Sequence, residues 1–305
     1  MNSGRFGNPS SLQEKNKKAA STLVMDVWTV LKQDKTALIG FFIILGLVAT
    51  ALFAPYISPY GYSEQHIAHA FKGPSPLFWL GTDEFGRDLL TRMIWGSRPA
   101  LLVGVLSVMV SVSIGVPIGL MAGYKLGMVD RIISWFVDVA LSFPSILLGL
   151  MIVILLGPGV LNVAFAIGIS HVPQYVRLAR GPTMSVRNLD FVRASKALGA
   201  TDARIAFSHI LPNIIGPIII MGTLSIAGAI RMEASLSFLG FGVNPPTPSW
   251  GNLIRDGVDN ILQSPWMALF PGLALTFSVL AFNMVGDSLR DMFDPRIMMG
   301  KEKMG

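Results

Sequence analysis

The chain has no cysteine, and charged residues make up only 14% of its 305 residues. Without cysteine, neither a disulfide framework nor a thiolate metal site can form. The sequence also lacks the G-x-x-x-x-G-K-[ST] phosphate loop and the H-E-x-x-H zinc motif, and its four histidines are scattered. No spacing brings Ser, His and Asp together as a catalytic set. We therefore expect no enzyme, no catalytic residue, no metal site and no cofactor.

Hydrophobic residues are abundant instead, at 52% of the chain, and the mean hydropathy is +0.58. These values are typical of a membrane protein with several spans. A helix needs about 20 mostly apolar residues to cross the hydrocarbon core. The fourth of the six expected spans is the weakest, because it is short and contains His171 and Pro173. The spans are expected at 36–57, 99–123, 133–156, 160–178, 213–235 and 267–287.

A net charge of +6 is common among nucleic-acid-binding proteins, but in a membrane protein an excess of Lys and Arg more often sets the orientation. We therefore expect no nucleic acid partner. With both termini in the cytoplasm, 18 of the 24 Lys and Arg residues lie on the inner side. The first apolar run starts too late and is too long for a signal peptide, so it is predicted to be an uncleaved anchor. The chain is predicted to begin with a cytoplasmic N-terminal segment (1–35), a first transmembrane helix (36–57) and an extracytoplasmic loop (58–98). A transmembrane core (99–287), which includes the inner loop 177–212, and a cytoplasmic tail (288–305) follow.

The outer loop 58–98 contains the amphipathic stretch GTDEFGRDLLTRMIWGSR. Thr82 or Asp83 is predicted to cap a helix there, because both residue types accept hydrogen bonds from the first helical N–H groups. The apolar face of this helix would be formed by Phe85, Leu89 and Met93. The second outer segment, 236–266, is too rich in Pro and Gly for a long regular element.

In the second span, Gly115, Gly119 and Gly123 recur at four-residue spacing. Such a row of small residues allows two helix backbones to approach closely. Pro117 lies within the row and is expected to loosen or bend the helix. The pattern therefore predicts a close helix–helix contact along this face.

Few ionisable residues fall within the expected spans, and such residues are candidates for function. Arg231 and Glu233 are the candidates for a pathway or gate, although both lie near the expected membrane interface. They are two residues apart and so do not face each other on a helix. The other ionisable residues within or at the end of the expected spans are Asp138 and Asp287.

The most informative stretch is the basic loop, residues 177–212, which lies between two apolar spans. Its first helical pattern covers about 188–198, and Gly199 is placed as a C-terminal cap. Thr201 or Asp202 is predicted to start a second helix, and Pro212 to end it. The basic residues of the loop are Arg177, Arg180, Arg187, Arg193, Lys196 and Arg204, and one face of its first helix has Phe191, Ala194, Ser195 and Leu198.

This loop resembles the signature E-A-A-x-x-x-G-x9-I-x-L-P, which marks permease subunits of binding-protein-dependent ABC importers. Three positions depart from it, with Arg for Glu, Ser for the second Ala and His for Ile, while the spacing, the Gly and the Leu-Pro pair are kept. Ala200 follows the Gly and is included with the expected ATPase-coupling residues. The matching positions are Arg193, Ala194, Ser195, Gly199, His209, Leu211 and Pro212.

Three further segments are similar to the C-type permeases of dipeptide and oligopeptide importers, to which nickel and glutathione importers are related. They are LGTDEFGRDLLTRMIWGSR at 80–98, EASLSFLGFGVNPPTPSWGNL at 233–253 and FNMVGDSLRDMFDPR at 282–296. The resemblance covers roughly residues 36–296. It implies the type I ABC importer permease fold, a bacterial cytoplasmic (inner) membrane location, a B-type permease as heterodimer partner, two cytoplasmic ATPase subunits and an extracytoplasmic solute-binding protein. In the family the loop fits a cleft on the ATPase, which explains how a chain without a phosphate loop can belong to an ATP-driven pump.

Two other classes of function remain open at this point. An ion-gradient-driven secondary transporter would use Asp138, Glu233 and Asp287 as ion sites, although no inverted repeat is evident. A membrane scaffold without a transport role would bind anionic membrane lipid through the basic loop. Co-isolation with an ATPase favours the permease, and uptake without ATP favours the secondary transporter.

The orientation can be tested by labelling single introduced cysteines, since the chain contains none. We expect a cysteine at position 200 to react with an impermeant reagent only from the cytoplasmic side, because the basic loop is on the inner face. Labelling of position 200 from outside intact cells would overturn the topology.

Overall fold

Long apolar helices form most of the molecule. The computed structural model describes residues 34–292, and within this range the chain is helical, with one isolated β-bridge and no strand. The all-α prediction is therefore confirmed. Most of the predicted N-terminal segment 1–35 and of the predicted tail 288–305 lies outside the described residues.

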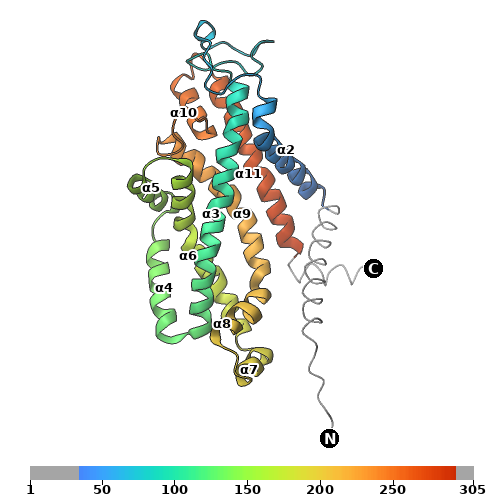
Figure 1. Cartoon of the computed structure of the whole chain (residues 1–305), viewed down its shortest axis with the longest axis vertical. Helices are drawn as coiled ribbons and strands as arrows, with labels where there is room; N and C mark the ends of the chain where they lie inside the picture. Colours follow the sequence, from blue (N-terminus) through green and yellow to red (C-terminus); the bar gives the residue numbers. More distant parts are fainter. Residues whose placement is uncertain (1–33, 293–305) are drawn as a thin grey trace.

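The long helices run side by side along the vertical axis of Figure 1. The segment between α2 and α3, together with α10, lies at one end of the bundle, and α7 and α8 lie at the other (Figure 1). In chain order the elements are α2 (Lys35–Ile57), the 3-10 turn η1 (Ile67–His69), α3 (Leu89–Lys125), α4 (Gly127–Leu141), α5 (Ser145–Leu156), α6 (Val160–Val186), α7 (Asp190–Ala197), α8 (Asp202–Arg204), the π-helical segment η2 (Ile205–Ile210), α9 (Leu211–Phe238), α10 (Trp250–Asp259) and α11 (Trp266–Met292).

Four helical runs in the described range are long and apolar enough to cross a membrane: α2, α3, the run 202–238 and α11. The pair α4 and α5 meets the same test as one bent span, which gives up to five. The expected fourth span lies within α6, which does not meet the test. Helix α6 contains His171, Gln174, Arg177 and Arg180, so its polar residues lower its hydropathy.

The expected third span, 133–156, is not straight. Helices α4 and α5 meet at an angle of 91°. Pro144 precedes α5 and has no N–H to continue the hydrogen-bond ladder of α4. The side chain of Ser142 also donates to the carbonyl oxygen of Asp138 at 2.8 Å, at the end of α4. The prediction missed this break because the run is apolar on both sides of it.

The predicted helix capped by Thr82 or Asp83 is wrong. The carboxylate of Asp83 accepts hydrogen bonds from the backbone N–H groups of Phe85 and Arg87, both at 2.9 Å, and so closes a turn. The residue that caps the helix is Asp88, whose carboxylate accepts from the N–H of Thr91 at 2.8 Å. Helix α3 then runs without interruption from Leu89 to Lys125, so the second part of the amphipathic stretch, 89–98, is the outer end of the second span.

The glycine row of α3 forms the close contact that its spacing predicts. Helices α3 and α6 make the most extensive contact of any pair of described elements. An added Cβ at Gly115 would lie 2.6 Å from the Cβ of Tyr175, and one at Gly119 would lie 2.5 Å from the carbonyl oxygen of Val176. A Cβ at Gly123 would lie 2.6 Å from the carbonyl oxygen of Arg180. Any larger residue would therefore force the two backbones apart.

We predict that Gly119→Ala destabilises the protein by about 1–3 kcal/mol, because its methyl group overlaps the backbone of α6. Gly46→Ala is the matched control, since position 46 has no atom within 4 Å of an added Cβ and lies in the interior of helix α2. The control should be neutral or slightly stabilising. Thermal unfolding of the two purified variants measures the difference. Equal melting temperatures would show that the row is not a tight contact.

Candidate functional site

The basic loop ends in a folded projection at one end of the bundle, which we call the knob (residues 190–210). It consists of α7, a turn at Gly199, α8 and η2. Gly199 has φ +82°, a conformation that side chains with a Cβ rarely adopt. The hydroxyl of Thr201 accepts from the N–H of Arg204 at 3.4 Å and caps the second helix. The predicted helix–Gly–helix arrangement is thus confirmed.

The outward surface of the knob is apolar at its centre and basic around it. The side chains of Phe191 and Leu198 are 41% and 88% exposed, and Ala194 between them is exposed as well. The basic residues Arg193 and Lys196 are exposed on the same helix. Exposed apolar side chains beside small residues are typical of a surface that another protein covers.

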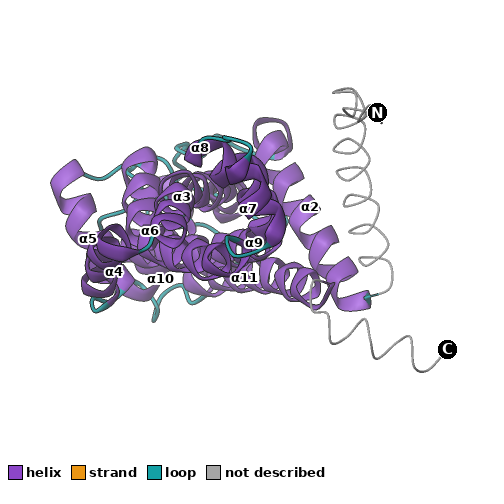
Figure 2. Cartoon of the chain, turned by 90° about the horizontal axis from the view of Figure 1, so that it is seen from below, coloured by secondary structure: helices purple, strands orange, loops and turns teal. Residues whose placement is uncertain are grey.

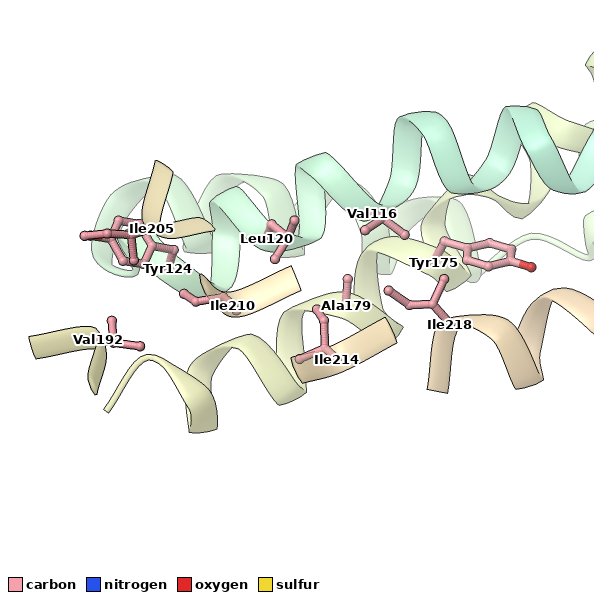
Figure 3. Packing of buried hydrophobic residues seen from close by; sticks show 10 residues of the cluster. All are labelled: Val116, Leu120, Tyr124, Tyr175, Ala179, Val192, Ile205, Ile210, Ile214 and Ile218. Atoms are coloured by element: carbon pink, nitrogen blue, oxygen red, sulfur yellow. The ribbon is translucent and has the colours of Figure 1, made fainter. Parts of the chain in front are cut away.

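The inward surface of the knob belongs to a hydrophobic core shared with three long helices. The core includes Val192 of α7 and Ile205 and Ile210 of η2, all at most 3% exposed. Figure 3 shows Ile205 beside Tyr124 at the inner end of α3, with Leu120 one turn further along. The other members are Val116 of α3, Tyr175 and Ala179 of α6, and Ile214 and Ile218 of α9.

A hydrogen bond ties the second helix of the knob to α3. The hydroxyl of Tyr124 donates to the carboxylate of Asp202 at 2.9 Å, and the guanidinium of Arg187 lies over the Tyr124 ring at 5.9 Å. In the view from below, α7 and α8 lie over the end of the bundle (Figure 2). Because the knob is packed and bonded to α3, a displacement of the knob would be passed to the long helices.

Pro212 does not end the second helix, contrary to the prediction. It occupies one of the first two positions of α9, where a missing N–H costs little. The π-helical segment η2 joins α8 to α9, so the run from 202 to 238 is one continuous helical element. The knob and the α9 span therefore form one connected body.

The structure places the residues of the family signature in two groups. Arg193, Ala194 and Ser195 lie on α7, and the Ser195 hydroxyl donates to the carbonyl oxygen of Phe191 at 2.8 Å. His209, Leu211 and Pro212 lie at the junction of η2 and α9, and Leu211 packs against the shared core. Gly199 and Ala200 form the turn, and Ala200 also packs against the core.

Two ion pairs join α4 to α6 above the knob. The guanidinium of Arg180 contacts the carboxylate of Asp130, with Nη2 to Oδ2 at 2.8 Å. The Nη2 of Arg177 lies 2.6 Å from Oδ1 of Asp138. Two of the basic-loop arginines are therefore engaged within the chain. Asp138, a candidate ion site from the sequence, is an ion-pair partner in this arrangement.

The two candidate pathway residues, Arg231 and Glu233, face different surroundings. Arg231 lines a cavity of about 430 Å³ between α5, α6 and α9. Glu233 is fully buried on another side of α9, and its Oε1 accepts from the Ser237 hydroxyl at 2.7 Å. It thus helps to hold the outer end of α9 and does not line the cavity.

The opposite end of the bundle is braced by buried charges that sequence reasoning missed. The Nε atoms of Arg87 and Arg92 lie 2.6 and 3.4 Å from Oδ2 of Asp83. The Trp250 indole N–H donates to the carbonyl oxygen of Met93 at 3.0 Å and joins α10 to α3. Burial raises the pKa of the Asp256 carboxyl, and the neighbouring Glu84 raises it further. The predicted outer segments therefore form one folded cap.

Family models identify the class of protein to which this arrangement belongs. Residues 115–299 match the binding-protein-dependent transport system inner membrane component, and residues 22–74 match the N-terminal TM domain of oligopeptide transport permease C. The chain therefore belongs to the family of binding-protein-dependent transport permeases. It is a multi-pass inner membrane protein and the permease subunit of an ATP-driven importer, a class of transport proteins and not of enzymes.

Individual relatives narrow the branch to the C-type permeases of peptide importers. The chain is 41% identical over 289 residues to the dipeptide transport system permease protein DppC of Alkalihalophilus pseudofirmus, covering 95% of each chain. It is 43% identical to the di/tripeptide transport system permease protein DppC of Pseudomonas aeruginosa, covering 89% of this chain and 92% of the relative. The glutathione transport system permease protein GsiD of Pectobacterium atrosepticum is 40% identical, with 88% of this chain and 89% of the relative covered.

A solved structure supports the fold independently. The chain resembles the MetNI methionine ABC transporter in inward-facing conformations with a TM-score of 0.53 and 18% identity, over 68% of this chain and 97% of that chain. The predicted type I ABC importer permease fold is confirmed. A family of importers with this architecture implies a partner permease, an ATPase and a binding protein in general, and the comparisons give the secondary-transporter alternative no support.

Proposed function

We propose that this chain is the C-type permease of a peptide importer and forms half of the pathway for di- and tripeptides or solutes of similar size. The support is the set of relatives that carry dipeptide, di/tripeptide and glutathione transport names. Its partners in this proposal are a B-type permease in a heterodimer, two cytoplasmic ATPase subunits and an extracytoplasmic solute-binding protein. The chain itself catalyses no reaction, and both of its termini lie in the cytoplasm.

The observation that carries the coupling role is the two-sided knob. Its outer face exposes Phe191, Ala194 and Leu198, and its inner face is continuous with the core of α3, α6 and α9. A partner groove that closes on the outer face would therefore move three long helices together. The ATPase is the partner that this proposal assigns to the groove, with the signature residues at the contact or at its base.

We predict that Gly199→Val weakens ATPase docking or uncouples hydrolysis from uptake. A β-branched residue at φ +82° is strained by about 1–3 kcal/mol, while no atom within 4 Å would collide with the new Cβ. Gly199→Asn is the matched control, because Asn tolerates positive φ. ATPase stimulation and uptake by the reconstituted four-subunit transporter are the measurements, with membrane insertion as the check on folding.

Two substitutions on the outer face of the knob test docking of the ATPase without straining the backbone at Gly199. Leu198→Ser should reduce the affinity for the ATPase about tenfold or more, because it removes a large apolar side chain from the contact. Ala194→Trp should exclude the groove sterically, and changes at Arg193 or Lys196 should matter less. Normal uptake and normal ATPase stimulation by the Gly199→Val, Leu198→Ser and Ala194→Trp transporters would sink the coupling assignment.

The cap at the other end is proposed to meet the solute-binding protein. Photo-crosslinkers at Asn244 and Leu262 should capture it, because both side chains are exposed, Leu262 at 98%. Asp83 is unsuitable despite its place in the outer loop, since it is 1% exposed and ion-paired. A crosslinker at Met128, at the other end of α3, is the control. Capture at Met128 alone would refute the assignment.

A further inference from the structure

The cavity beside Arg231 has the chemistry of a site for an anion. Its volume of about 430 Å³ falls in the range of small-molecule sites, roughly 300–1,000 Å³. It opens at the surface of this chain, on the faces of α5, α6 and α9. This inference rests on the proposed function, in which these helices form half of a peptide pathway.

Arg231 is a cation without a counter-ion. Among residues 34–292, its side chain has no ion pair and no hydrogen bond, and the described lining of the cavity includes no Asp or Glu. Glu233, two residues further on, is buried elsewhere and bonded to Ser237. A charge left unpaired on a surface that a second permease covers would be costly, so it calls for an anionic partner.

The remaining polar lining is suited to the same ligand. Gln174 and Ser225 supply an amide and a hydroxyl donor. His171 also lines the cavity, and its Nδ1 lies 2.8 Å from the carbonyl oxygen of Ile167, so Nε2 of the neutral ring is an acceptor that suits an N–H group of a peptide and not its carboxylate.

The N-terminus of α5, at the break between α4 and α5, adds a positive electrostatic potential beside the cavity. Ser145, the first residue of the 12-residue helix α5, lines the cavity. No side chain caps this helix end. The N–H groups of Leu147 and Leu148 donate to the carbonyl oxygen of Pro144, whereas those of Ser145 and Ile146 have no acceptor in the described part of the chain. The exposed N–H groups and the positive end of the helix dipole both favour a negative charge nearby.

We infer that this cavity is a transient binding station for the carboxylate of the transported peptide, with Arg231 as its specificity-determining residue. The planar guanidinium matches a carboxylate through two parallel hydrogen bonds. A carboxylate is the anionic group that every free peptide carries at its C-terminus. The exposed position of Arg231 keeps the contact weak enough for the solute to leave again, as passage through a pathway requires.

The test uses the assembled transporter without its binding protein and a single cysteine at Ser235, which lines the cavity one helical turn from Arg231. The rate at which N-ethylmaleimide modifies this cysteine is measured with added trialanine, trialanine amide or inorganic phosphate. We expect trialanine to slow the reaction at concentrations about tenfold lower than the amide requires, because a charge-assisted hydrogen bond is lost with the amide.

Substitutions of Arg231 test whether this residue causes the preference for trialanine over trialanine amide. Arg231→Gln should abolish the preference for the free acid, and Arg231→Lys should retain part of it. Arg131→Gln is the matched control for loss of one positive charge, since Arg131 is exposed on α4 and does not line the cavity. Size-exclusion chromatography of each variant checks that the complex is intact.

Equal protection by acid and amide, protection by neither, or a preference that survives Arg231→Gln would each overturn the inference. Protection by phosphate as strong as by trialanine would show an unspecific anion site and would also overturn it. ATP-dependent uptake of peptides by the unmodified transporter with its binding protein is measured separately. Its absence would refute the proposed function, whereas its presence with any of the outcomes above refutes the carboxylate station alone.

Discussion

The close contact between α3 and α6 is the constraint on which the rest of the structure depends. At Gly115, Gly119 and Gly123 the backbones approach so closely that an added Cβ would lie 2.5–2.6 Å from α6 atoms. This contact places the inner end of α3 against the knob, where Tyr124 bonds Asp202. It also holds α6 in position against α9, where His171 and Gln174 line the cavity. A wider spacing between α3 and α6 would disturb both sites together.

Polar residues within the bundle differ in whether their charged or polar groups have partners. Arg180 pairs with Asp130, and Oε1 of the buried Glu233 accepts from Ser237, while Oε2 of Glu233 has no hydrogen-bond partner among the described residues. Arg231, by contrast, lies on a cavity with no partner among the described residues. Since a polar group in a membrane bundle costs free energy unless it is satisfied or solvated, the unpaired charge of Arg231 on a cavity makes this residue a candidate for ligand binding.

The knob and the cavity are linked by continuous packing. The core that begins at Val192 and Ile205 in the knob ends at Tyr175 and Ile218, one helical turn or less from the cavity residues Gln174 and Met221. Figure 3 follows this row of side chains from the knob along α3, α6 and α9. A rigid, close-packed core transmits displacement better than a chain of isolated contacts. The arrangement therefore gives a physical route by which a partner at the knob could alter the surroundings of Arg231.

The sequence by itself determined the helical class, the family, the glycine contact and the turn at Gly199, because each rests on local composition or on spacing along one helix. Only the structure showed the 91° break before Ser145, the continuation of the π-helical segment into α9 past Pro212, and the cap of α3 at Asp88. It also separated Arg231 from Glu233 and buried Asp83. The break, the cap and the passage past Pro212 follow from local hydrogen bonding, which hydrophobic periodicity does not report. The surroundings of Arg231, Glu233 and Asp83 depend on which groups other elements bring against them, and periodicity along one chain carries no information about such contacts.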